Sequence, residues 1–215
     1  NALTINGALS STGAMAVVNA GTFTTGANGD VIAAGGLSQT GAGSSRIAGD
    51  ITTTASNISF ATAVVVTGNV AMGSANGNIN FSGLLDGDGS ATPANLTLGS
   101  GAGNVTFSTK VGSLATLSAL GINTTGLASA TDTIQVGSFA INAASALPAG
   151  SATLLANVTT STTQVYNTAL NVGANINLTG TQIIATAASG KCRPFAVFGG
   201  AGCANIPANC FQACD

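Results

Sequence analysis

The motif Asn57-Ile58-Ser59-Phe60 decides the fold, because it returns as Asn78-Ile79-Asn80-Phe81 and again as Asn104-Val105-Thr106-Phe107. The composition would produce fewer than one such match by chance, since only eight Phe occur in the chain. A period of about 20 residues or slightly more is typical of solenoids, in which each repeat forms one coil and buries its apolar face by stacking on its neighbours.

An aliphatic residue follows each of these Phe residues by four positions, and Tyr166 with Leu170 has the same spacing. Side chains alternate along a strand, so we expect the apolar residues to point inward and the polar ones outward. In stacked coils the aromatic and aliphatic side chains then form interior ladders, and the asparagines stack at a corner. The predicted ladder residues are Phe60, Phe81, Phe107, Tyr166, Val64, Leu85, Val111 and Leu170, and the predicted corner residues are Asn57, Asn78 and Asn104.

Short β-branched segments occur along the whole chain, for example at residues 51–54, 64–66 and 134–136, and turn pairs such as Asn28-Gly29 and Asn76-Gly77 separate them. A helical chain is disfavoured because Glu is absent and Gly occurs 30 times. The sequence therefore predicts an all-β protein, a parallel β-solenoid with coils of about 20 residues. The alternative is a β-sandwich, whose strands follow one another every 8–12 residues or so.

Charged side chains are scarce in this chain. Its 215 residues include 4 Lys+Arg and 6 Asp, with no Glu, His or Trp, so that 5% are charged, against about 25% in an ordinary domain. Four cations cannot neutralise a run of phosphates, which excludes nucleic-acid binding by a basic surface. Histidine catalysis and His-ligated metals are excluded, and Ser or Thr nucleophiles have no imidazole base. We expect no catalytic residue, no metal site and no cofactor.

The hydrophobic fraction of 45% does not predict a membrane span. The densest apolar run covers residues 61–66, much shorter than the roughly 18 residues that a spanning helix needs. The chain begins without Met and without a basic segment followed by an apolar one. We therefore expect a processed product that has been exported from the cell.

The composition changes after Gly190, and all four cysteines follow it: Cys192, Cys203, Cys210 and Cys214. This predicts two parts, a solenoid body at 1–190 and a Cys-rich cap or tail at 191–215. An even number of cysteines in an exported chain predicts two disulfides, with three pairings open. Zinc ligation and free or intermolecular thiols are the alternatives, and zinc is disfavoured because only Cys210 and Cys214 have the spacing of a knuckle. Such a tail could cap the open end of a solenoid or dock on a further subunit.

The segments Gly103-Asn104-Val105-Thr106-Phe107 and Thr163-Gln164-Val165-Tyr166-Asn167, with residues 170–175 after them, resemble the repeats of filamentous-haemagglutinin-type exoproteins. The resemblance covers about residues 50–187. It implies a right-handed parallel β-helix shaft, export by two-partner secretion and an adhesive or structural role on a bacterial surface. The Asn-Pro-containing motifs of that family's secretion domain do not occur here, so the resemblance suggests a shaft or C-terminal piece.

These observations favour a non-enzymatic extracellular protein, either an adhesin shaft or a subunit that assembles into filaments. A net charge of −2 gives little self-repulsion and so favours association into a filament or surface layer. A cell-surface or glycan partner is expected, and nucleic acid is not. The alternative function is an ice- or glycan-binding solenoid module, which Thr-x-Thr triplets such as Thr52/Thr54 and Thr131/Thr133 suggest, although their spacing is irregular.

Overall fold

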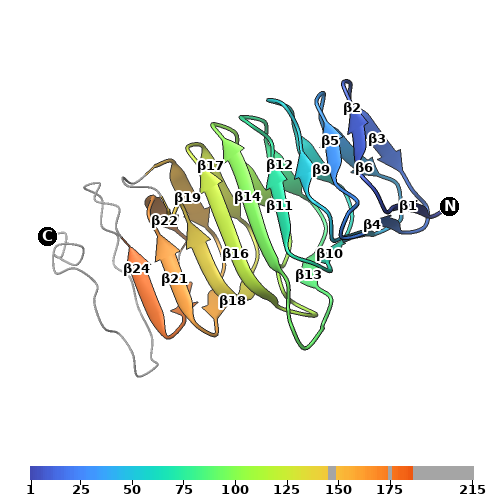
Figure 1. The fold of residues 1–215 in the computed structure, drawn as a ribbon. Coiled ribbons are helices and arrows are strands. Elements are labelled where there is room, and N and C mark those ends of the chain that lie inside the picture. Colours follow the sequence, from blue (N-terminus) through green and yellow to red (C-terminus); the bar gives the residue numbers. More distant parts are fainter. Residues whose placement is uncertain (145–148, 174–175, 186–215) are drawn as a thin grey trace, which may run out of the picture.

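A computed structural model describes residues 1–144, 149–173 and 176–185 of the chain. The described part is all-β, a parallel β-solenoid of about eight turns with about 22 residues per turn and no helix. Its turns are stacked in chain order from the N-terminus to the last strand (Figure 1). The predicted fold class is confirmed, and the sandwich alternative is excluded because every strand pairing that the structure describes here is parallel.

Each turn contributes to three faces, and the first strand of each of the early turns builds the first face. After Leu85 this face continues through Val111, which forms single bridges to Leu85 and to Ile134. Ile134 begins the long strand β18 (Ile134–Ile141), and the start of β18 pairs with β20 (Val158–Thr160) on the same face. The strands of the first face are β1 (Leu3–Ile5), β4 (Phe23–Thr25), β7 (Ser45–Ile47), β10 (Val64–Val66), β13 (Leu85–Gly87), the start of β18, β20 (Val158–Thr160) and β23 (Leu178–Thr179).

The second face contains the longest strands. Its register shifts once, between Gly99 and Gly101, where the strand Asn95–Gly101 pairs with the strand Leu117–Thr124. The second face consists of β2 (Leu9–Ser11), β5 (Val31–Ala33), β8 (Ile51–Thr52), β11 (Val70–Gly73), β14 (Asn95–Gly101), β16 (Leu117–Thr124), the end of β18, β21 (Thr163–Tyr166) and β24 (Gln182–Ala185).

The third face is the most regular of the three. Its eight strands pair one after another with no register shift. It consists of β3 (Met15–Val18), β6 (Leu37–Thr40), β9 (Ile58–Phe60), β12 (Ile79–Phe81), β15 (Val105–Phe107), β17 (Leu127–Ala130), β19 (Ser151–Leu154) and β22 (Ala169–Val172).

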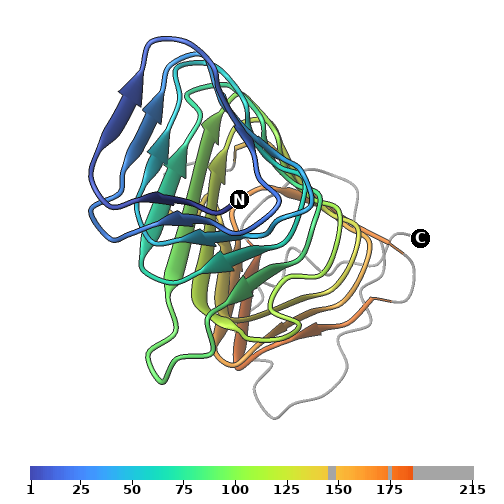
Figure 2. The ribbon, with the colours of Figure 1, turned by 90° about the vertical axis from the view of Figure 1, so that its right-hand side faces the viewer.

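The turns enclose a common interior (Figure 2), and alternation along each strand fills it with apolar side chains. Partners in successive turns form columns, so each buried side chain packs on its equivalent in the turns before and after it. On the second face one such column contains Val31, Ile51, Met72, Leu98, Ile122, Ile141 and Tyr166, all buried.

Turn length varies because the corners differ. The turn that leads from Ser45 to its partner Val64 is short, and the turn that leads from Leu85 to its partner Val111 is longer. The longer turn contains an exposed loop at residues 88–93, which projects between β13 and β14. Corners that stack closely require Gly: a Cβ on Gly103 would collide with the carbonyl oxygen of Gly77 in the turn before it.

Candidate functional site: the outer surface of the third face

One column of polar side chains runs along the outside of the third face. Ser59 pairs with Asn80, Asn80 with Thr106 and Thr106 with Ser129, and each of them is half-buried on the outer surface. The Oγ of Ser129 donates a hydrogen bond of 3.4 Å to the Oγ1 of Thr106. We call this column the polar ladder; its seven members are Ser38, Ser59, Asn80, Thr106, Ser129, Thr153 and Asn171.

The predicted corner asparagines form a second column beside the polar ladder. The Oδ1 of Asn57 accepts the N–H of Asn78 at 2.8 Å, and the Oδ1 of Asn78 accepts the N–H of Asn104 at 2.8 Å. The Oδ1 of Asn104 then accepts the N–H of Leu127 at 2.9 Å. These bonds tie four successive turns together at the edge of the third face, and they hold the asparagine side chains in one orientation.

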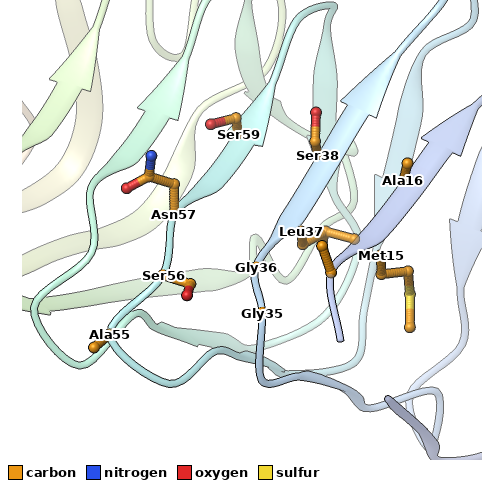
Figure 3. A pocket seen from close by; sticks show the side chains of 11 residues that line it. Met15, Ala16, Gly35, Gly36, Leu37, Ser38, Ala55, Ser56, Asn57 and Ser59 are labelled. Carbon is orange, nitrogen blue, oxygen red and sulfur yellow. The ribbon is translucent and has the colours of Figure 1, made fainter. Parts of the chain in front are cut away.

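A groove hollows the third face near its N-terminal end, between residues 14–16, 35–38 and 55–59 (Figure 3). Its volume is about 540 Å³. The corner beside the groove requires glycine: a Cβ on Gly35 would collide with the backbone of Ala14 in the turn before it, and Gly36 has a φ of +106°. The lining combines apolar Met15 with polar Ser38, Asn57 and Ser59.

The strands of the third face carry no charged residue. By contrast, Arg46 and Asp86 lie in strands of the first face, and Lys110 directly precedes Val111 on that face. The charged side chains of the part that the structure describes are Asp30, Arg46, Asp50, Asp86, Asp88, Lys110 and Asp132.

Several acidic residues hydrogen-bond to the backbone of the solenoid. Asp86 is 4% exposed and accepts the N–H of Leu114 at 3.0 Å. Hydrogen bonds from Ser90 lower the pKa of Asp88 below its usual value. Over the residues that the structure describes, no three His, Cys, Asp or Glu side chains gather in a way that could hold a metal ion.

The structure brings the three motif Phe residues together inside the third face. The ring centroids of Phe60 and Phe81 are 5.6 Å apart and those of Phe81 and Phe107 are 5.5 Å apart, with interplanar angles of 9° in both pairs. The aliphatic residues of the motif are in register on the first face, where Val64 pairs with Leu85 and Leu85 bridges to Val111.

Tyr166 and Leu170 lie elsewhere. Tyr166 is in β21 on the second face, beside Ile141, and its ring contacts Phe139 edge-on at 5.8 Å. Leu170 is in β22 on the third face, where it pairs with Ala152. Both residues therefore stand one face earlier in the turn than their spacing predicts.

The polar ladder is absent from the residues predicted above, although the sequence carries a signal for it. The third residue of each motif copy is polar: Ser59, Asn80 and Thr106. These residues point outward, because each stands between two buried neighbours on a strand. The Thr-x-Thr triplets do not supply this ladder, since Thr52 lies on the second face and Thr24 on the first.

The predicted disulfide residues Cys192, Cys203, Cys210 and Cys214 lie outside the described residues, as does the predicted boundary at 190/191. Within the described ranges, no helix is long and apolar enough to cross a membrane.

Comparison with known proteins gives no relative for this chain: no family model, no curated protein and no solved structure matches it. The parallel β-solenoid itself is the class that the fold defines.

Proposed function

We propose that this chain is a non-enzymatic structural or adhesive protein of a bacterial surface, located outside the cell, which serves as a shaft or as a self-assembling filament subunit. The observation that carries this proposal is the open edge of the first turn. The resemblance of its repeats to filamentous-haemagglutinin-type exoproteins supports the adhesive role. The absence of His and Glu from the sequence supports a function without catalysis.

The strands of the first turn, β1, β2 and β3, each pair with a strand on one side only. Their inward-facing residues are correspondingly uncovered. Leu3 is 42% exposed and Leu9 is 39% exposed, whereas their partners in the second turn, Phe23 and Val31, are fully buried. The edge thus presents both apolar side chains and unpaired backbone groups.

A further parallel coil would satisfy this edge completely, because it would bury Leu3 and Leu9 and pair the free N–H and C=O groups. If the coil belongs to the same polypeptide, it lengthens a shaft. If it belongs to a second copy, the contact is head-to-tail and repeats without closing, which produces a filament. The low net charge of −2 does not oppose such stacking.

Negative-stain microscopy and light scattering over a concentration series test the self-assembling form. Eight turns at about 4.8 Å each make a single rod about 40 Å long. We expect longer rods at high concentration for the unmodified chain, and single rods for Leu3→Lys/Leu9→Lys, which places two charges on the edge.

The matched control is Gln135→Lys/Thr159→Lys, which adds the same charge at two exposed positions of the first face, remote from the edge. This variant should assemble like the unmodified chain. Single rods for all three proteins at every concentration would contradict the self-assembling form of the proposal.

A further inference from the structure

We infer that the third face binds an extended, uncharged polysaccharide, which lies along the polar ladder with one end in the groove. This inference rests on the adhesive part of the proposed function and specifies its ligand. The ladder, the groove and the distribution of charge support it independently of one another.

The ladder has the geometry of a linear polymer site. Its seven members stand in consecutive turns, Ser38 first and Asn171 last, and the register of the third face has no shift between them. Neighbouring members are therefore about 4.8 Å apart along the axis. This spacing is close to the length of one sugar residue in an extended chain, so successive sugars can meet successive turns.

The side chains of the ladder match sugar hydroxyls. Ser and Thr hydroxyls each donate one hydrogen bond and accept others, and Asn amides do both through separate atoms. In the corner column, the Oδ1 of Asn57 is occupied by the N–H of Asn78. No residue of the described ranges accepts a hydrogen bond from the Nδ2 of Asn57, so this group remains available to a ligand at the groove.

The distribution of charge selects a neutral ligand. An acidic polysaccharide would meet no Lys or Arg on the strands of the third face, because Arg46 and Lys110 belong to the first face. A hydrogen-bonding surface without charge suits a neutral polymer, since no buried charge is left unpaired when the ligand covers it.

The groove supplies the anchoring end of the site. Its volume of about 540 Å³ lies within the range of small-molecule sites, about 300–1,000 Å³. Ala16 offers its methyl group to the apolar face of a sugar ring, while Ser38 and Ser59, its neighbours in register on the outer surface, offer hydroxyls (Figure 3).

Each turn contributes only neutral hydrogen bonds, and the buried aromatic rings of the described part are not available for stacking on sugars. Affinity must therefore come from many weak contacts along one polymer. We expect binding to long chains and little binding to disaccharides of the same composition.

Retention on insoluble cellulose, chitin and starch, and affinity electrophoresis in gels that contain xylan or alginate, test this inference. The unmodified chain should be retained by at least one neutral polymer and not by anionic alginate. Thr106→Lys, in the middle of the ladder, should weaken retention about tenfold or more, which corresponds to a loss of about 1.4 kcal/mol. The matched control Thr159→Lys, on the first face, should bind like the unmodified chain.

Three results would overturn the inference: no neutral polymer retains the chain, alginate retains it equally well, or Thr159→Lys loses as much binding as Thr106→Lys. Binding to ice is measured as a further test, because a flat array of hydroxyl groups can also order water. The face would be assigned to ice instead if no polysaccharide retains the chain, the unmodified chain inhibits ice recrystallisation, and Thr106→Lys abolishes that inhibition. The Leu3→Lys/Leu9→Lys variant should still bind the polymer, so failure of self-assembly and failure of this inference are distinguishable.

Discussion

At the scale of single residues, the most informative side chain is Tyr166, the one tyrosine in the sequence. It is fully buried, and its hydroxyl donates a hydrogen bond of 2.8 Å to the Oε1 of Gln164. Gln164 is also fully buried and donates through Nε2 to the carbonyl oxygen of Thr179 at 2.8 Å. A polar pair that is satisfied in this way can stay inside an apolar solenoid, but a phenolate could not, because burial raises the pKa of Tyr166.

The raised pKa of Tyr166 predicts a loss of stability in alkali. Below pH about 10 both the folded and the unfolded chain keep the phenolic proton, and the tyrosine has no effect on pH dependence. Above that pH the unfolded chain releases the proton and the folded chain does not, so the free energy of unfolding falls by up to about 1.4 kcal/mol per pH unit. Chemical unfolding at a series of pH values measures this slope.

Tyr166→Phe is the control, because it should remove the contribution of the tyrosine to the slope. At neutral pH this variant loses the hydrogen bond to Gln164, which should lower the free energy of unfolding by about 1 kcal/mol. Trp is absent, so the ultraviolet absorbance of phenolate reports on Tyr166 alone. Ionisation near pH 10 in the folded chain would show that the side chain is not buried as described.

At the scale of elements, the stacked Phe residues of β9, β12 and β15 predict graded effects on stability. Phe81 stacks on a ring at each side, whereas Phe60 and Phe107 each stack on one ring. Replacing a buried Phe by Ala costs about 3–5 kcal/mol, and an aromatic pair adds about 0.5–1.5 kcal/mol beyond the area that it buries. We expect Phe81→Ala to lower the free energy of unfolding most, and Phe60→Ala and Phe107→Ala to lower it less.

Urea unfolding of the three variants measures this order, and Phe81→Leu is the conservative control because it retains most of the buried volume. Equal losses for the three Ala variants would mean that the contacts between the rings contribute nothing beyond burial.

The strands also show what the sequence could predict. The motif copies that begin at Asn57, Asn78 and Asn104 predicted the parallel coil and its period because each copy occupies the same place in its turn. Tyr166 and Leu170 have the same spacing as that motif but lie on other faces, because every turn contains three strands separated by corners and the same spacing can occur at more than one corner. Periodicity alone therefore predicts that the chain forms coils, but it does not determine on which face of the coil a given residue lies. The polar ladder was missed for a related reason, since it is a column that only the register of successive turns brings together.

At the scale of the whole molecule, two features stand out among the described residues: the charged residues that lie in strands, Arg46 and Asp86, both belong to the first face, and the strands of the first turn pair on one side only. The stability of a stacked array depends on contacts between neighbouring turns. An end turn with one neighbour therefore opens more easily than a turn in the middle, and its amide protons exchange faster.

Hydrogen exchange followed by mass spectrometry measures this difference along the chain. We expect the amides of β1, β2 and β3 to exchange faster than those of β9, β12 and β15 in the middle turns. If a second copy covers the edge, protection of the first turn must rise with protein concentration while protection of the middle turns stays constant. Leu3→Lys/Leu9→Lys should abolish that rise. At high dilution the first turn should be less protected than the middle turns. Equal protection of both would contradict the open edge, because the backbone groups of the first turn would then already be paired within a single chain.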